Sequence, residues 1–114
     1  EMGRALYCGP YLSSALMSVY ALLLGASGEA KQQLLPGIAA GATVASLALV
    51  GESGRWEAGA IEMRATSDGG GWTLSGMKNF VLDGHVADVL LVAARTDKGV
   101  SLFQVGGDAD GVTR

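Results

Sequence analysis

Cysteine is almost absent from this chain, which excludes several classes of protein. Cys8 is the single cysteine and His85 the single histidine. No intrachain disulfide can therefore form, and no cluster of cysteine and histidine with zinc-binding spacing exists. We predict no metal site, and a chain without disulfides fits the reducing cytoplasm, where we expect this protein to act.

Charge of either sign is scarce, with 8 Lys and Arg against 11 Asp and Glu and a net charge of −3. So few basic residues cannot build a basic face, and we predict no nucleic-acid partner. The longest apolar stretch, Tyr11–Leu24, would extend about 21 Å as a helix, short of the roughly 30 Å core of a bilayer. It therefore predicts a buried helix and no membrane span. No apolar leader opens the chain, and we expect the chain to be a piece of a longer protein.

Helical signals fill the first part, and we expect residues 1–41 to be helical. Pro10 suits the first turn of a helix, and Gly25 suits its end. Between them apolar residues recur at helical spacing, at Leu12, Leu16, Val19 and Leu23. Ser27 is a good N-cap for a second helix, which Pro36 should end or kink.

The pattern changes to strands from residue 43 onward. Short β-rich or alternating runs occupy Thr43–Val50, Ala60–Thr66, Trp72–Leu82, Asp88–Ala94 and Val100–Val105. Asp68 and the three glycines after it predict a hairpin turn, and Gly76 predicts a bend. We therefore predict an α+β fold, in which a helical segment (1–42) precedes an antiparallel β-barrel or sandwich domain (43–114).

Acid–base chemistry is sparse in these residues. His85 has no nucleophile and carboxylate at a suggestive spacing, so a turn residue is the simpler interpretation. Glu52 and Glu57 flank a loop that contains Gly54 and Trp56, where solvated side chains are expected. The loop after residue 49 and the aromatic Phe80 could together offer N–H groups and a flat ring to a planar ligand. We identify no catalytic residue in this chain.

Five segments in order resemble the acyl-CoA dehydrogenase family. They are Glu1–Ala5, Leu34–Ala39, Leu47–Leu49, Gly71–Val81 and Ala87–Arg95. The Gly71–Val81 segment follows the family pattern Gly-Trp-x-Leu-x-Gly-x-Lys-x, which ends in Phe or Trp and then Val or Ile. The resemblance covers nearly the whole chain, as the end of the family's N-terminal helical domain followed by its middle β-domain.

This resemblance implies a function and a set of partners. Members of the family use FAD to oxidise an acyl-CoA thioester to the α,β-enoyl-CoA: a carboxylate removes the Cα proton while a hydride leaves Cβ. Electron-transfer flavoprotein is the expected electron acceptor, and a homo- or hetero-oligomer is the expected assembly. The family's catalytic Glu lies in a C-terminal helical bundle outside these residues, so we expect this piece alone to be inactive.

The resemblance also implies cofactor-binding residues. Phe80 takes the place of the aromatic side chain against the flavin, with Val81 and Leu82 beside it. The loop that bonds the ring's edge corresponds to Leu49, Val50, Gly51, Glu52 and Ser53. Trp56, further along that loop, is the expected substrate-binding residue.

Two departures from the family pattern remove hydroxyl groups. The usual Thr-Glu-Pro is missing after Leu49, and Leu82 stands where Thr is usual. Only backbone groups could then bond the flavin. A divergent bacterial member of the family, or one half of a mixed oligomer, would fit these two losses. Two alternatives stay open: a flavin oxidase or monooxygenase on the same scaffold, and a non-catalytic structural subunit.

Overall fold

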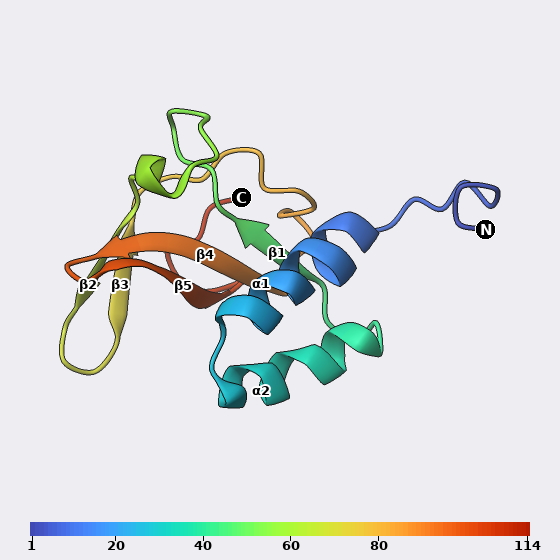
Figure 1. Ribbon diagram of the computed structural model, residues 1–114, viewed down its shortest axis with the longest axis horizontal. Coiled ribbons are helices and arrows are strands. Elements are labelled where there is room, and N and C mark those ends of the chain that lie inside the picture. Colours follow the sequence, from blue (N-terminus) through green and yellow to red (C-terminus); the bar gives the residue numbers. More distant parts are fainter.

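The computed structural model describes residues 1–114 and places the helices before the sheet (Figure 1). A π-helix, η1 (Tyr11–Ser18), runs directly into α1 (Val19–Gly25), and α2 (Gly28–Ala39) follows. The strands are β1 (Ala45–Ala48), β2 (Arg64–Ser67), β3 (Trp72–Ser75), β4 (Val89–Thr96) and β5 (Gly99–Gly106). A short 3-10 helix, η2 (Ala58–Ala60), interrupts the connection between β1 and β2.

Strand β4 organises the sheet. Along one side it pairs antiparallel with β5 over its whole length. Along the other side it pairs in parallel first with β1, from Ala45 opposite Val89, and then with β2, where Arg64 lies opposite Arg95. Strand β3 adds antiparallel to β2. The α+β class is thus confirmed, but the sheet is open and mixed where an antiparallel barrel or sandwich was expected.

The two parallel pairings have a simple cause. Parallel neighbours need a long connection between them, whereas antiparallel neighbours can be joined by a tight turn. The chain between β1 and β4 contains the whole β2–β3 hairpin, so β1 and β4 can run in the same direction.

Apolar side chains cover both faces of β4. On one face Leu22, Leu34 and Ile38 of the helices pack with Ala45 and Leu91 of the sheet. On the opposite face Ala48, Ala87, Leu90 and Val92 form a second cluster. This second face borders an open hollow of about 600 Å³, which Lys78 and Val81 also line.

The N-terminal residues are not helical, contrary to the expectation for 1–41. Residues 1–9 form turns and an irregular segment, and every one of them is exposed. A short helix in water needs tertiary packing to persist, and these residues have none. Helix formation begins only after Pro10, in agreement with the predicted role of that residue.

Helix α2 begins as predicted and ends later than predicted. Ser27 caps it by accepting a hydrogen bond from the N–H of Ala30 at 3.2 Å. Pro36 lies inside the helix, which continues to Ala39. Ile38, buried in the core against Leu22, holds this last turn in place despite the missing N–H of Pro36.

The predicted strand Trp72–Leu82 is wrong beyond Ser75. Gly76 has φ of +140°, which ends β3, and the chain has no regular structure from there to β4. The predicted hairpin between β2 and β3 is confirmed, with Gly69 at φ +86° in its turn. No helix of the structure has both the length and the apolar character needed to cross a membrane.

Candidate functional site

The two segments predicted to form one site lie side by side. Lys78 Nζ donates to the carbonyl of Leu49 at 2.9 Å, and the N–H of Asn79 donates to the carbonyl of Val50 at 2.9 Å. Asn79 Nδ2 donates to the carbonyl of Gly51 at 3.4 Å. Two consecutive residues thus hold three consecutive carbonyl groups. The loop after β1 and the residue before Phe80 are fixed to each other by this pairing.

This pairing uses the carbonyl groups of the loop and leaves N–H groups free. The N–H groups of Gly51, Glu52 and Ser53 donate no hydrogen bond within the chain, and neither do those of Val81 and Leu82. Unpaired backbone donors are strong hydrogen-bonding groups that need a partner in water or in a ligand. The loop therefore offers backbone N–H donors to anything that binds beside it.

Phe80 presents an exposed ring next to this loop. Its side chain is 73 % exposed, and its φ of +54° lies in the left-handed region that large side chains rarely adopt. Phe80 was predicted to lie near the end of a strand, but it lies in the irregular segment between β3 and β4. Met77, Leu82 and Val86 of the same segment are exposed as well. Several exposed apolar side chains on one short segment are typical of a binding surface.

The predicted cofactor-binding residues differ in what they can present. Glu52, Ser53, Phe80 and Leu82 are exposed, whereas Leu49 and Val81 are half-buried. Val50 and Gly51 are buried, so they can take part only through their backbone. The structure thus brings the two predicted segments together. Some of their residues present exposed side chains, whereas Val50 and Gly51 contribute only backbone groups.

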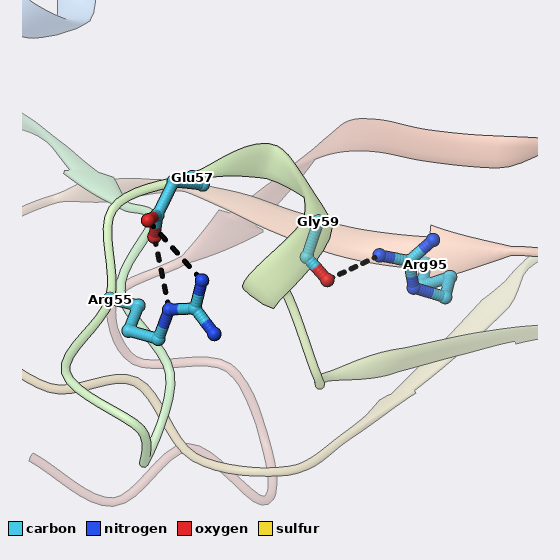
Figure 2. A network of polar contacts seen from close by, with 4 residues as sticks. All are labelled: Arg55, Glu57, Gly59 and Arg95. Carbon is cyan, nitrogen blue, oxygen red and sulfur yellow. Dashed lines mark hydrogen bonds and ion pairs between the residues drawn. The ribbon is translucent and has the colours of Figure 1, made fainter.

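Trp56 lies in the long loop between β1 and β2, which two arginines hold (Figure 2). Arg95 of β4 donates to the carbonyls of Ala58, Gly59 and Ile61 at 3.2–3.3 Å. Arg55 and Glu57, the neighbours of Trp56 in the sequence, form an ion pair at 3.3 Å. The Trp56 side chain itself is 56 % exposed. The sequence analysis included Arg95 only as the end of a matched segment and did not predict its contacts with this loop.

Two ionisable groups of this region have shifted pKa values. The pKa of the Glu57 carboxyl is lowered, first by its own backbone N–H and then by Arg55. Partial burial lowers the pKa of the Lys78 amine, and the nearby Glu62 opposes that change. The lowered pKa keeps the Glu57 carboxylate ionised at neutral pH, so Glu57 does not serve as a general acid there.

Two buried serines that sequence reasoning missed support the segment after Phe80. Ser13 Oγ donates to Asp83 Oδ2 at 2.6 Å, and Ser46 Oγ donates to the carbonyl of Leu82 at 2.6 Å. Ser13 belongs to η1, and 70 positions separate it from Asp83. No local pattern could have predicted such a contact.

Comparison with known proteins assigns the family. Residues 40–114 match the middle domain of acyl-CoA dehydrogenases. The probable acyl-CoA dehydrogenase FadE25 of Mycobacterium tuberculosis is 36 % identical over 97 residues, which span 81 % of this chain and 25 % of that protein. The chain belongs to the acyl-CoA dehydrogenase family, as its sequence pattern predicted.

Solved structures agree with this assignment. The ChsE4–ChsE5 complex of Mycobacterium tuberculosis contains a chain with a TM-score of 0.83 and 33 % identity, covering 98 % of this chain and 29 % of that one. A glutaryl-CoA dehydrogenase of Mycobacterium smegmatis in complex with FADH2 gives a TM-score of 0.77 and 33 % identity, covering 84 % and 25 %. The chain thus spans about a quarter of the length of such relatives.

Proposed function

We propose that the whole protein is a FAD-dependent acyl-CoA dehydrogenase and that this chain supplies one wall of its flavin site. The observation that carries the proposal is the pairing of Lys78 and Asn79 with the carbonyls of Leu49, Val50 and Gly51. It joins the predicted ring-edge loop and the predicted aromatic wall into one surface. The family assignment and the similarity to a glutaryl-CoA dehydrogenase bound to FADH2 support it further.

The residues present suit a planar ligand with polar edges. The unpaired N–H groups of Gly51, Glu52 and Ser53 suit the carbonyl and ring-nitrogen acceptors of such a ligand. The exposed ring of Phe80 and the side chain of Leu82 suit its flat face, because aromatic and apolar groups exclude water from it. When bound, FAD would accept the hydride that leaves the substrate's Cβ. The residues of this chain would orient the flavin ring and exclude water from its surroundings.

The acyl group and the partners belong to the same proposal. Relatives include a cyclohexane-1-carbonyl-CoA dehydrogenase of Geobacter metallireducens and an isobutyryl-CoA dehydrogenase of Dictyostelium discoideum, so we propose an acyl-CoA substrate without specifying its chain. The similarity to a chain of the ChsE4–ChsE5 complex supports an oligomer with a copy of itself or a related subunit. We further propose electron-transfer flavoprotein as the acceptor and the cytoplasm as the location.

Trp56 is our proposed substrate-facing residue. Its indole is more than half exposed, two residues before the part of the loop that Arg95 bonds to β4. An exposed aromatic side chain on a loop with a fixed backbone suits a contact with the apolar part of a ligand.

The visible spectrum of the purified full-length protein tests the proposed function. We expect absorption bands of an oxidised flavin that bleach when an acyl-CoA thioester is added under anaerobic conditions. Free CoA serves as the control and should leave the bands unchanged. Bleaching by a nitroalkane in place of the thioester would favour the flavin oxidase alternative.

A non-catalytic structural subunit is the second candidate. It is favoured by the departures from the family pattern: no Thr-Glu-Pro follows Leu49, and Leu82 stands where Thr is usual. A colourless protein that takes up no added FAD, yet assembles with a related subunit, would support this candidate over the enzyme.

A further inference from the structure

The segment that carries the proposed flavin wall has left-handed backbone at both ends. Phe80 has φ of +54° and Asp83 has φ of +55°. Aspartate adopts this conformation readily, but at a bulky residue such as Phe80 it persists only where the surroundings impose it. Val81 and Leu82 lie between these two positions, so their orientation depends on what holds Phe80 and Asp83 in place.

The turn's own backbone bonds hold it only in part. The N–H of Gly84 donates to the carbonyl of Val81 at 3.1 Å, and the N–H of Val86 donates to that of Asp83 at 3.1 Å. The first bond is accepted by Val81 itself, and the second lies beyond Leu82. From outside the segment, Arg114 Nη1 donates to the carbonyl of Gly84 at 3.4 Å. The hydroxyls of Ser13 and Ser46 donate to Asp83 and to the carbonyl of Leu82, closer to Phe80.

Both supporting hydroxyls are buried. Ser13 is 1 % exposed and Ser46 is fully buried. The Ser13 hydroxyl also lies 3.2 Å from the carbonyl of Pro10, but its contact with Asp83 is shorter, at 2.6 Å. A hydrogen bond from a hydroxyl to a carboxylate is stronger than one to a neutral group, so Asp83 is the preferred acceptor.

The π-helix aims Ser13 and its neighbour Ser14 at two different targets. Ser13 Oγ contacts Asp83, whereas Ser14 Oγ accepts from the N–H of Ala45 in β1 at 3.0 Å. Ser18 Oγ donates to the carbonyl of Ser13 at 2.8 Å and fixes that turn of the helix. Short π-helical segments often occur at functional sites. Here the wide turn lets adjacent serines of one helix contact separate elements.

We propose that Ser13, acting through Asp83, is a positioning residue for the flavin wall, so that the helical segment sets the placement of Phe80, Val81 and Leu82. The inference rests on the proposed function, because Phe80, Val81 and Leu82 form a flavin wall only if the protein binds FAD. Ser46 supports the same segment from β1. Ser14, one residue further along η1, supports the sheet and not the wall.

The test uses Ser13→Ala and the matched control Ser14→Ala in the full-length protein. Each variant removes one buried hydroxyl from the same helix. Hydrogen–deuterium exchange of residues 80–86 and the dissociation constant of FAD are measured for both. We expect Ser13→Ala to speed exchange in this segment and to weaken FAD binding, each by about tenfold, the usual effect of losing one buried hydrogen bond. We expect Ser14→Ala to speed exchange around Ala45 and to leave residues 80–86 unchanged.

Two variants at Asp83 separate the effect of losing the Ser13–Asp83 hydrogen bond from the effect of the left-handed backbone. They also leave the interior of η1 unchanged. Both Asn and Gly tolerate a left-handed φ, but only Asn keeps an acceptor for Ser13. Asp83→Asn keeps a neutral hydrogen bond and should therefore stay closer to the wild type, whereas Asp83→Gly should reproduce the effect of Ser13→Ala. These variants decide the question even if Ser13→Ala fails to fold.

Equal effects of Ser13→Ala and Ser14→Ala on residues 80–86, or equal effects of Asp83→Asn and Asp83→Gly, would overturn the inference. A wild-type protein that binds no FAD would overturn the proposed function instead. The exchange measurement needs no cofactor and would still report whether Ser13 positions the segment.

Discussion

Lys78 shows how one residue can serve both the core and the site. Its stem lines the hollow beside the second apolar cluster, while its amine donates to the carbonyl of Leu49 at 2.9 Å. Burial disfavours the charged ammonium, so the pKa of Lys78 lies below the usual 10.5. Glu62 acts in the opposite direction, because a nearby negative charge stabilises the ammonium.

The substitution Glu62→Gln should therefore lower the pKa of Lys78 further. It removes the charge that opposes burial and leaves the burial itself in place. The pH dependence of Lys78 labelling by isotopic acetic anhydride, read by mass spectrometry, would report the midpoint. Glu29→Gln, on the exposed first turn of α2, is the control and should leave this midpoint where it is. A rise in the midpoint after Glu62→Gln would contradict the assigned effect of Glu62.

At the scale of single residues, the sequence predicted that Phe80 and the loop after Leu49 lie together. It did not predict their backbone conformation or the hydrogen bonds that hold them. The resemblance placed Phe80 and the loop after Leu49 in one site, and the structure brings them together through Asn79 and Lys78. The left-handed backbone of Phe80 could not be foreseen, because nothing in an aromatic residue favours it. The serine contacts were equally hidden, since they join residues far apart in the chain.

At the scale of elements the β2–β3 hairpin offers a test of backbone conformation. Gly69 and Gly70 lie in the same turn, and an added Cβ would meet nothing within 4 Å at either position. Only Gly69 has a positive φ, of +86°. Gly69→Ala should thus cost about 1 kcal/mol through the left-handed backbone alone.

Hydrogen exchange in Arg64–Ser75 would measure this cost. About 1 kcal/mol corresponds to roughly fivefold faster exchange through local opening. Gly70→Ala is the matched control, and we expect it to stay within about 0.5 kcal/mol of the wild type. Equal effects at the two glycines would show that the turn does not depend on the conformation of Gly69.

Elements with a local cause were predictable, and elements with a distant cause were not. The cap at Ser27, the hairpin at Gly69 and the buried strand β4 all follow from neighbouring residues. The continuation of α2 past Pro36 follows instead from the burial of Ile38 against another helix. Residues 1–9 show the reverse, since they find no packing partner and form no helix.

At the scale of the whole molecule, Leu91 holds the helical layer to the sheet. It is 3 % exposed and packs with Leu22, Leu34 and Ile38. Leu91→Ala should lower the free energy of unfolding by about 2–5 kcal/mol, because it removes buried contacts and leaves a cavity. Leu24→Ala, at a side chain that is 85 % exposed, should change it by less than about 0.5 kcal/mol.

Denaturant unfolding followed by tryptophan fluorescence would compare these two variants. A loss at Leu24 as large as that at Leu91 would mean that the exposed end of α1 is covered in the full-length protein.

The overall order of helices and strands was predictable from periodicity alone. The parallel pairing of β1 and β2 with β4 was not, because periodicity gives the direction of side chains and not the neighbour of a strand.

The late position of β4 has a consequence for how this protein is made. Strands β1 and β2 leave the ribosome before the strand with which both must pair, since β4 begins only at Val89. Until then the nascent chain exposes an unpartnered strand and an apolar helix layer, at a synthesis rate of about 5–20 residues per second. Chaperone binding to the growing chain should therefore be strongest before residue 96 emerges and should fall sharply afterwards.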